Sequence, residues 1–345
     1  MNDFKKPVVL NSSENYQLED KTPLVVNWKD RLIDLTRDYP EPQFLLEFNG
    51  VKFFTIGDIV VIKGKPKKGK SHLMIAFIVA LMSGEYVGIS RLNKVTKILY
   101  VDCEMHLNYT ALLNRKIHRA VGVDPNQNSN ELFVLNLKVD TPTERERIIE
   151  DAIRELKPDI VFIDGVKDIT RTEPNDQAEG KRIGEELKQW TAKYDCMIAV
   201  AIHENKNDMN SRGAVGAAVE EISSEVWRID RDIEGLFTAS QTLFRYRSPV
   251  KDLCFTMDDE GNIQKAEPPE RMSNAERKLQ SMNFLFSEIF SNFKQLSYTN
   301  LEKEYMRVKK VGKTAAFNAI TFAFQNKIIA KDLVGDYVFS NLIIE

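Results

Sequence analysis

The sequence predicts an α/β domain with a mostly parallel sheet, followed by a smaller C-terminal domain of the winged-helix type. Three observations support this fold class. Residues 64–71 read GKPKKGKS, between a β-branched run and an apolar run at helical spacing. Further apolar strands then alternate with amphipathic helices, which is typical of a parallel sheet covered on both faces. Beyond residue 272 the pattern changes to three helices and a hairpin, the element order of a winged helix-turn-helix.

The first predicted elements lead into the GKPKKGKS loop. Residues 1–39 are polar and mixed in charge, and they predict an arm rather than a domain. A hairpin with an Asn49-Gly50 turn follows, because this dipeptide suits a two-residue turn. The elements expected up to the first helix are strands over 44–48, 51–55 and 58–63, and a helix over 72–82.

Strands and helices then alternate along the rest of the predicted core. The expected strands are 97–102, 132–137, 159–164, 196–202, 225–230, 236–246 and 253–257, and the expected helices are 108–121, 143–156 and 176–193. Thr143 and Glu146 predict a capping box at the start of the second of these helices. A turn is expected over 258–262. We place the core at 40–265 and a Pro- and charge-rich linker at 266–272.

The C-terminal residues 273–345 predict a winged helix-turn-helix. The expected helices are 273–292, 297–308 with Ser297 as cap, and 311–326, and the hairpin strands are 328–331 and 337–340. Phe317, Ile320 and Phe324 are predicted to form the buried face of the third helix, since they recur at helical spacing.

Basic residues near that third helix are candidates for binding duplex DNA. Lys309, Lys310 and Lys313 stand at its expected amino end, where a recognition helix meets the major groove. The positive charge of the segment is mild, so a winged helix that docks protein stays open as an alternative.

Bulk composition limits the classes of function. The length of 345 residues favours two domains, and 43% hydrophobic residues suffice for a sizeable core. The net charge of −3 means that any DNA contact must come from local basic patches. Three scattered cysteines and four histidines without metal spacing predict buried thiols and no zinc site. No apolar run approaches the roughly 20 residues of a membrane span. We therefore expect a cytoplasmic protein without a membrane partner.

Residues 64–71 are a complete GxxxxGKS phosphate-binding loop. The strand–loop–helix setting aims backbone N–H groups and the positive end of the helix at phosphates. In this motif Lys70 reaches the β- and γ-phosphates, and Ser71 ligates Mg²⁺. The expected nucleotide-binding residues are Gly64, Lys65, Pro66, Lys67, Lys68, Gly69, Lys70, Ser71 and His72.

Polar residues at the ends of three other strands are candidates for the chemistry of ATP. Glu104, expected beside the phosphate-loop strand, can orient and deprotonate the attacking water, although a solvated loop carboxylate is the alternative. Asp164 is a candidate Mg²⁺ ligand, and a capping role is disfavoured because residues 165–166 are not expected to begin a helix. His203 can contact the γ-phosphate, and a structural histidine is an equal alternative.

Together the segments GKPKKGKS, YVDCE, IVFIDG, AIHENK, SRGAVGAAVEE and FRYRS resemble the RecA-like core of hexameric helicases of the RepA and DnaB type, AAA-like ATPases of plasmids and mobile elements. The resemblance covers about residues 40–265. It implies ATP and Mg²⁺ as cofactors, Glu104 as the catalytic base, and a ring whose ATP sites are completed by basic residues of a neighbouring subunit. Arg212, or the pair Arg245 and Arg247, would be that residue, and a surface ion pair is the alternative for each.

The departures from this family bear on the function that we expect. Lys67 and Lys68 stand where the family prefers small residues, and a polar arm stands in place of a large N-terminal domain. Lys206, in the loop after His203, would face single-stranded DNA in the ring channel.

We expect a Mg²⁺-dependent ATPase acting on DNA, as an oligomeric RepA-like helicase or an ATP-driven loader in plasmid or mobile-element replication or mobilisation. An ATP-controlled DNA-binding regulator or partner-binding module without unwinding activity is the alternative. A small-molecule P-loop kinase is disfavoured, because no lid-like arginine cluster is visible.

Overall fold

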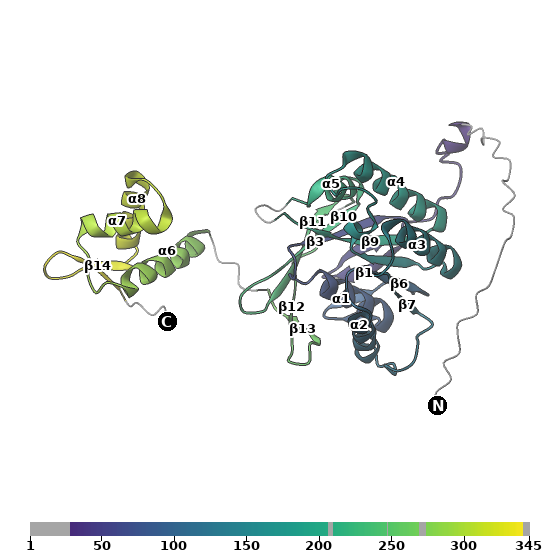
Figure 1. Cartoon of the computed structure of the whole chain (residues 1–345), viewed down its shortest axis with the longest axis horizontal. Helices are drawn as coiled ribbons and strands as arrows, with labels where there is room; N and C mark the ends of the chain where they lie inside the picture. The colour runs from purple at the N-terminus through teal and green to yellow at the C-terminus, as the bar shows by residue number, and fades with distance from the viewer. Residues whose placement is uncertain (1–27, 206–209, 247, 269–273, 341–345) are drawn as a thin grey trace, which may run out of the picture. The chain divides into compact units, whose positions relative to one another are not determined.

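The computed structural model describes residues 28–205, 210–246, 248–268 and 274–340, and Figure 1 shows the chain. Met1–Pro42 form one unit and Gln43–Glu345 a second. In the first unit the described residues include one short 3-10 helix, η1 (Trp28–Arg31). The predicted arm therefore lies mostly outside the described residues. No helix in the described ranges is long and apolar enough to cross a membrane.

A nine-stranded sheet forms the centre of the second unit. Its strands are β3 (Ile59–Gly64), β6 (Ile98–Asp102), β7 (Leu132–Asn136), β8 (Ile160–Asp164), β9 (Met197–His203), β10 (Glu225–Arg231), β11 (Phe237–Phe244), β12 (Leu253–Met257) and β13 (Ile263–Ala266). They follow the order β13-β12-β11-β10-β3-β9-β8-β6-β7. All pairings from β10 to β7 are parallel, and β11 to β13 are antiparallel. The mostly parallel α/β fold is confirmed.

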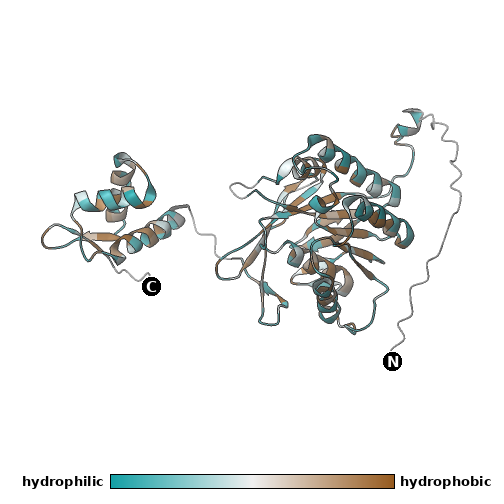
Figure 2. Ribbon diagram, in the orientation of Figure 1, coloured by the Kyte–Doolittle hydropathy of each residue, from teal (hydrophilic) through white to brown (hydrophobic). Residues whose placement is uncertain are grey.

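Helices cover both faces of this sheet (Figure 1). They are α1 (Lys70–Ser83), α2 (Leu107–Ala120), α3 (Pro142–Leu156), η2 (Val166–Ile169), α4 (Gln177–Tyr194) and α5 (Gly213–Ile222). Alternate residues of β3 enter opposite cores: Val60 packs in the cluster that contains α1 and α2, and Val61 in the cluster with α3, α4 and α5. The apolar strands lie between these layers, as the brown sheet in Figure 2 shows. Strands buried on both faces explain the nearly continuous apolar runs.

A smaller sheet packs beside the main one. It contains β1 (Phe44–Phe48), β2 (Val51–Thr55), β4 (Glu85–Tyr86) and β5 (Ile89–Arg91). The predicted hairpin is confirmed, with Asn49 and Gly50 both at positive φ, as a type I′ turn requires. The Phe54 backbone N–H donates to the buried Glu225 carboxylate at 2.7 Å, which connects the hairpin to the main sheet.

Several local predictions in the core are wrong. Helix α3 is capped by Thr141 and Glu144, with Pro142 at its first position, rather than by Thr143 and Glu146. The cap lies two residues earlier than predicted. Proline has no backbone N–H, so it suits the first helical position, where that N–H would have no partner within the helix. A helix, α5, was not expected in the Gly- and Ala-rich segment after Arg212. Strand β13 (Ile263–Ala266) was not expected, because the sequence pattern ended the core at residue 265 and began the linker at 266.

The C-terminal residues form three helices and a hairpin: α6 (Asn274–Ser291), α7 (Tyr298–Lys309), α8 (Lys313–Gln325), β14 (Ile329–Lys331) and β15 (Tyr337–Phe339). Their buried side chains form a hydrophobic cluster of their own. A backbone bridge between Leu296 and Tyr337 adds a third short extended segment beside the hairpin. Ser297 occupies the cap position of α7, but its side chain makes no cap hydrogen bond.

Two predictions about the third helix of this segment are wrong. Its buried face consists of alanines and Ile320, whereas Phe317 and Phe324 are 54% and 45% exposed. Small residues allow close helix packing, and this places the aromatic rings outside. Lys309 ends α7 and Lys310 follows it in the left-handed region, so only Lys313 opens α8.

Candidate nucleotide site

The phosphate loop lies tightly against β10 and β11, which explains its glycines. A Cβ at Gly64 would lie 2.5 Å from the Ile229 carbonyl oxygen. Gly69 has φ of +103°, and a Cβ there would lie 2.5 Å from the Phe237 ring. Both positions therefore exclude any larger residue. The loop backbone therefore lies between the carboxyl end of β3 and the start of α1.

Lys70 is buried at the base of this loop. Its Nζ lies 3.2 Å from the Gly64 carbonyl oxygen and 3.0 Å from Nδ1 of His203. Burial lowers the pKa of Lys70, and the nearby carboxylates of Asp164 and Glu104 oppose this effect. Because an ammonium group only donates hydrogen bonds, Nδ1 of His203 is the acceptor.

Ser71 and Asp164 meet as the motif predicts. The Ser71 hydroxyl donates to Oδ2 of Asp164 at 2.5 Å, and the Tyr100 hydroxyl lies 3.2 Å from the same oxygen. Burial raises the pKa of Asp164, and the Ser71 hydrogen bond opposes this rise. A short helix, η2, does follow β8, contrary to expectation, but Gly165 caps it, so the carboxylate stays directed at Ser71.

This oxygen pair fits Mg²⁺ when it is bound with a nucleotide. The described residues contain no group of three His, Cys, Asp or Glu that could hold a metal alone. Mg²⁺ in nucleotide sites is usually held by one or two protein oxygens, with phosphates and waters as the other ligands. Ser71 and Asp164 supply that number.

Glu104 reaches the site from farther away than expected. Strands β9 and β8 separate β6 from β3, so the prediction that Glu104 lies beside the phosphate-loop strand is wrong. The buried Asp102 orders the turn, because its Oδ1 accepts from the backbone N–H groups of Glu104 and Met105 at 3.0 and 2.9 Å. Asp102 is thus a positioning group at the end of β6.

The Glu104 carboxylate meets two nitrogen groups. Its Oε1 lies 3.7 Å from Nε2 of His203 and contacts the ammonium of Lys167. Interaction with His203 and with Lys167 lowers the pKa of Glu104 to about 2. Lys70, His203 and Glu104 therefore form one continuous line of contacts. The sequence pattern did not identify Lys167 as the partner of Glu104.

The candidate arginines lie in different places. The Arg212 backbone N–H donates to the His203 carbonyl at 2.7 Å, which places Arg212 near its own chain's site. Arg245 follows β11, whose other end, Phe237, packs on the phosphate loop. Since β11 has eight residues, its ends lie roughly 24 Å apart at ~3.4 Å per residue. Arg245 cannot serve its own chain's site. Arg247 and Lys206 lie outside the described residues.

The additional lysines of the loop have distinct surroundings. Lys68 pairs with Asp230 at 3.0 Å and also contacts the Arg231 carbonyl oxygen, so it anchors the loop to β10. Lys67 is exposed and has φ of +62°. The unusual Lys67-Lys68 pair thus contains one structural lysine and one that faces solvent.

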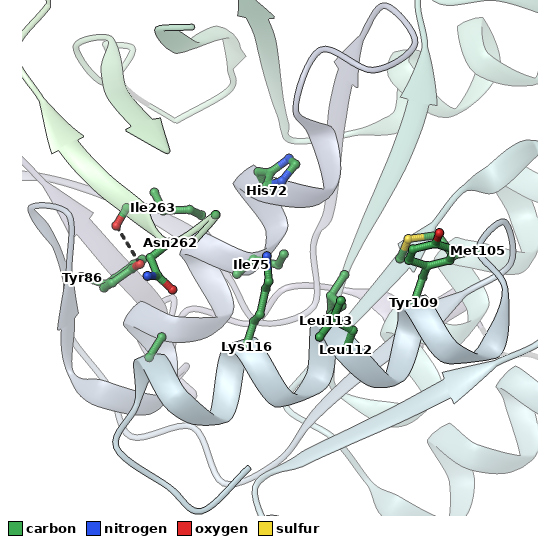
Figure 3. A pocket seen from close by; sticks show the side chains of 12 residues that line it. His72, Ile75, Tyr86, Met105, Tyr109, Leu112, Leu113, Lys116, Asn262 and Ile263 are labelled. Atoms are coloured by element: carbon green, nitrogen blue, oxygen red, sulfur yellow. Dashed lines mark hydrogen bonds between the residues drawn. The ribbon is translucent and has the colours of Figure 1, made fainter. Parts of the chain in front are cut away.

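A cavity of about 250 Å³ adjoins the phosphate loop at His72 (Figure 3). Its walls come from α1, α2 and the β12–β13 turn, and most are apolar, including Ile75, Met105 and Leu113. Lys116 and the Tyr86 hydroxyl, which donates to the Ile263 carbonyl at 2.9 Å, add polar groups. An apolar cavity next to the phosphate site can hold the base and ribose of a nucleotide. Its residues are spread over four segments, so no local motif predicted it.

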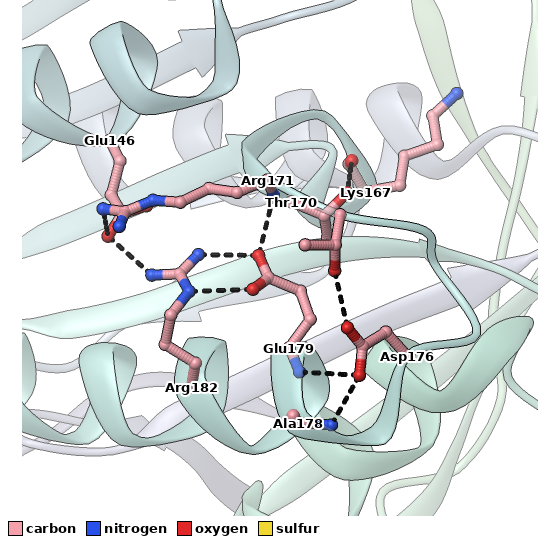
Figure 4. A network of polar contacts seen from close by, with 9 residues as sticks. Glu146, Lys167, Thr170, Arg171, Asp176, Ala178, Glu179 and Arg182 are labelled. Carbon is pink, nitrogen blue, oxygen red and sulfur yellow. Dashed lines mark hydrogen bonds and ion pairs between the residues drawn. The ribbon is translucent and has the colours of Figure 1, made fainter.

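Ion pairs attach the segment that follows η2 to helices α3 and α4 (Figure 4). Arg171 and Arg182 both pair with the buried Glu146, at 2.9 and 2.8 Å, and Arg182 also pairs with Glu179 at 2.8 Å. This explains the burial of Glu146, which the sequence pattern assigned to a helix cap. It also connects α3, α4 and the loop after β8.

Comparisons with known proteins match part of the chain. Residues 49–209 match the family model described as AAA domain, and this range contains the phosphate loop, Glu104, Asp164 and His203. A solved structure titled "Crystal structure of the RadB recombinase" is similar over 63% of this chain and 94% of that chain, with a TM-score of 0.46 and 16% identity. No curated protein matches the chain.

Proposed function

We propose that this chain is a Mg²⁺-dependent ATP hydrolase that acts on DNA. The observation that carries the proposal is the convergence of Lys70, Ser71, Asp164, His203 and Glu104 at the carboxyl ends of four parallel strands. In an open α/β sheet this edge is where ligands bind. The match to the AAA domain model over the same residues supports it.

Each side chain has a chemical task in this proposal. Lys70 binds the β- and γ-phosphates, and Ser71 and Asp164 hold Mg²⁺, which neutralises phosphate charge when bound. Glu104 orients the attacking water and takes its proton, while His203, held by Lys70, contacts the terminal phosphate. The cavity at His72 takes the nucleoside.

The finer proposal is an oligomeric RepA-like helicase or ATP-driven loader of plasmid or mobile-element replication or mobilisation. The order of motifs over residues 40–265 supports it. The position of Arg245 is compatible with it, because this residue is too far from its own chain's phosphate loop to act there and is free of that site for a role at a neighbouring copy's. The three helices and hairpin within 273–345 fit a winged helix that binds duplex DNA.

The test is ATP hydrolysis and oligomeric state, measured with and without Mg²⁺ and single-stranded DNA. We expect hydrolysis that requires Mg²⁺ and rises with DNA, and an assembly larger than a monomer. Lys70→Ala should lose ATP binding yet keep the fold, because the hydrogen bonds that its ammonium makes within the described residues go to the Gly64 and Lys65 carbonyls and to His203. Parent-level hydrolysis by Lys70→Ala would contradict the proposal.

A second candidate is an ATP-controlled regulator that docks DNA or protein without unwinding. It is favoured by the exposed Phe317 and Phe324 on α8 and by Leu333 at the hairpin turn, since exposed apolar side chains suit a protein partner. Strand displacement assays separate the two: ATP-dependent unwinding supports the helicase, and ATP-dependent binding without unwinding supports the regulator.

A further inference from the structure

Lys167 lies between the proposed catalytic base and a second cavity. It belongs to η2, directly after the β8 strand that ends in Asp164. Its ammonium contacts the Glu104 carboxylate, and its side chain also lines a cavity of about 420 Å³ at the carboxyl ends of β8 and β9. The Lys167 side chain is therefore next to both the Glu104 carboxylate and this cavity.

The contact with Lys167 is one of two, after that with His203, that make Glu104 a weaker base. A general base works best when its pKa is near the operating pH, whereas the interactions with His203 and Lys167 lower the pKa of Glu104 to about 2. Both side chains of the Lys167–Glu104 pair are 43% exposed. Water screens ion pairs this exposed, so they are weak. A competing anion can therefore remove Lys167 from Glu104.

The cavity beside Lys167 suits an anion attached to an apolar group. Arg212 lies on its rim and, within the described ranges, pairs with no acidic side chain. Glu173 is the acidic residue among the lining side chains. The rest of the lining is largely apolar and includes Val166, Pro174, Ala201 and Val215. A phosphodiester next to a base has this combination of charge and apolar surface.

We infer that Lys167 restrains Glu104 until a phosphodiester of single-stranded DNA enters this cavity and takes over the lysine ammonium. Lys167 is thus a positioning residue that couples strand binding to hydrolysis. The inference rests on the proposed function, because it needs an ATPase that responds to DNA. No bond is made or broken: one ion pair is exchanged for another.

The experiment compares ATP hydrolysis by the full chain and by Lys167→Met, with and without a long oligothymidylate. Met keeps most of the stem of lysine and removes its charge. We expect basal kcat to rise roughly threefold, the scale set by the loss of one exposed ion pair. KM for ATP should stay unchanged, and stimulation by oligothymidylate should fall to near one. Lys167→Arg should keep both the low basal rate and the stimulation.

Lys188→Met is the matched control. Lys188 is an exposed lysine of α4 that pairs with Glu185 at 2.9 Å, and it neither contacts Glu104 nor lines the cavity. It should behave as the parent does. A Lys167→Met variant that is no faster than the parent without DNA overturns the inference. A Lys167→Met variant that is faster without DNA but is still stimulated by oligothymidylate as strongly as the parent also overturns it. A parent chain that hydrolyses no ATP, or ignores DNA, contradicts the proposed function itself.

Discussion

At the scale of residues, the carboxylate of Glu104 gives the sharpest prediction about chemistry. Glu104→Gln should retain ATP binding but slow hydrolysis roughly 10²-fold or more, because an amide cannot take the proton from water. The change is nearly isosteric, and Asp102 still orders the turn through backbone N–H groups. Single-turnover hydrolysis and ATP binding measure the two effects separately.

The control for that variant is Glu131→Gln, a conservative change outside the site. If Glu104→Gln hydrolyses ATP as fast as the parent, the base lies elsewhere. Asp102 is then a poor substitute, since its oxygens already accept from two backbone N–H groups and from the Thr110 hydroxyl. Asp164, bonded to Ser71, would be the next residue to test.

Residues within one motif or at strand ends were predictable, and residues that meet through loops were not. Lys70, Ser71 and Asp164 lie where the phosphate-loop motif and the strand pattern place them. The Lys167–Glu104 contact depends on the order of strands and on the short helix η2. Neither leaves a local signal in the sequence.

At the scale of elements, Glu225 on β10 predicts a pH dependence of stability. It accepts from the Phe54 N–H of the hairpin and from the Trp227 indole. Burial raises its pKa from 4.5 to about 7, although these hydrogen bonds oppose the rise. A folded-state pKa above the unfolded value means that the folded state binds the proton more tightly. Its stabilising contribution is full below pH 4.5 and is lost as the pH rises through about 7.

Melting of the parent and of Glu225→Gln over this pH range measures the effect. Gln cannot titrate, so the stability difference between the two proteins should change steadily between pH 4.5 and about 7, with the parent losing its advantage as the pH rises. A difference between parent and Glu225→Gln that is constant with pH would contradict the assignment.

Elements with strong periodicity were predictable, and those of small residues were not. Apolar runs identified β3, β6, β8 and β9, whose carboxyl ends carry the phosphate site, whereas the short strands β4 and β5 were not expected. Helix α5 was missed because its Gly and Ala residues carry no clear apolar stripe. The same physics misplaced the buried face of α8, where Ala316, Ala319 and Ala323 pack inward.

At the scale of the whole molecule, the position of Arg245 predicts sites shared between chains. Arg245→Ala should lower kcat with little change in ATP affinity, because such a residue acts on transition-state charge. Mixing it with inactive Lys70→Ala chains should restore activity, since each supplies what the other lacks. Arg212→Ala is the contrasting variant: if it acts within its own chain, mixing should restore nothing. Absence of rescue for Arg245→Ala in a monomeric protein would contradict shared sites.

The division of the chain into parts follows from hydrophobic patterns more than from motifs. The C-terminal cluster around Phe286, Leu301 and Ile320 shares no residue with the two clusters of the main sheet. A segment that buries its own apolar side chains can fold independently. Chains ending at residue 272 should therefore keep ATP hydrolysis and lose affinity for duplex DNA.

Within the C-terminal segment, duplex DNA binding is expected to depend on Lys309, Lys310 and Lys313. All three are exposed, at the junction between α7 and α8. Each neutralised phosphate contributes ~0.9 to the slope of log affinity against log salt. Replacing the three with Ala in the full chain should weaken duplex binding and flatten this slope by up to about 2.7 units. Lys294, Lys303 and Lys327 are also exposed, and replacing them with Ala removes the same charge elsewhere in the segment. This control should flatten the salt dependence less than the first triple variant does. Equal losses in the two triple variants would mean that net charge, rather than this helix junction, binds DNA, and the protein-docking alternative would then be favoured for the C-terminal segment.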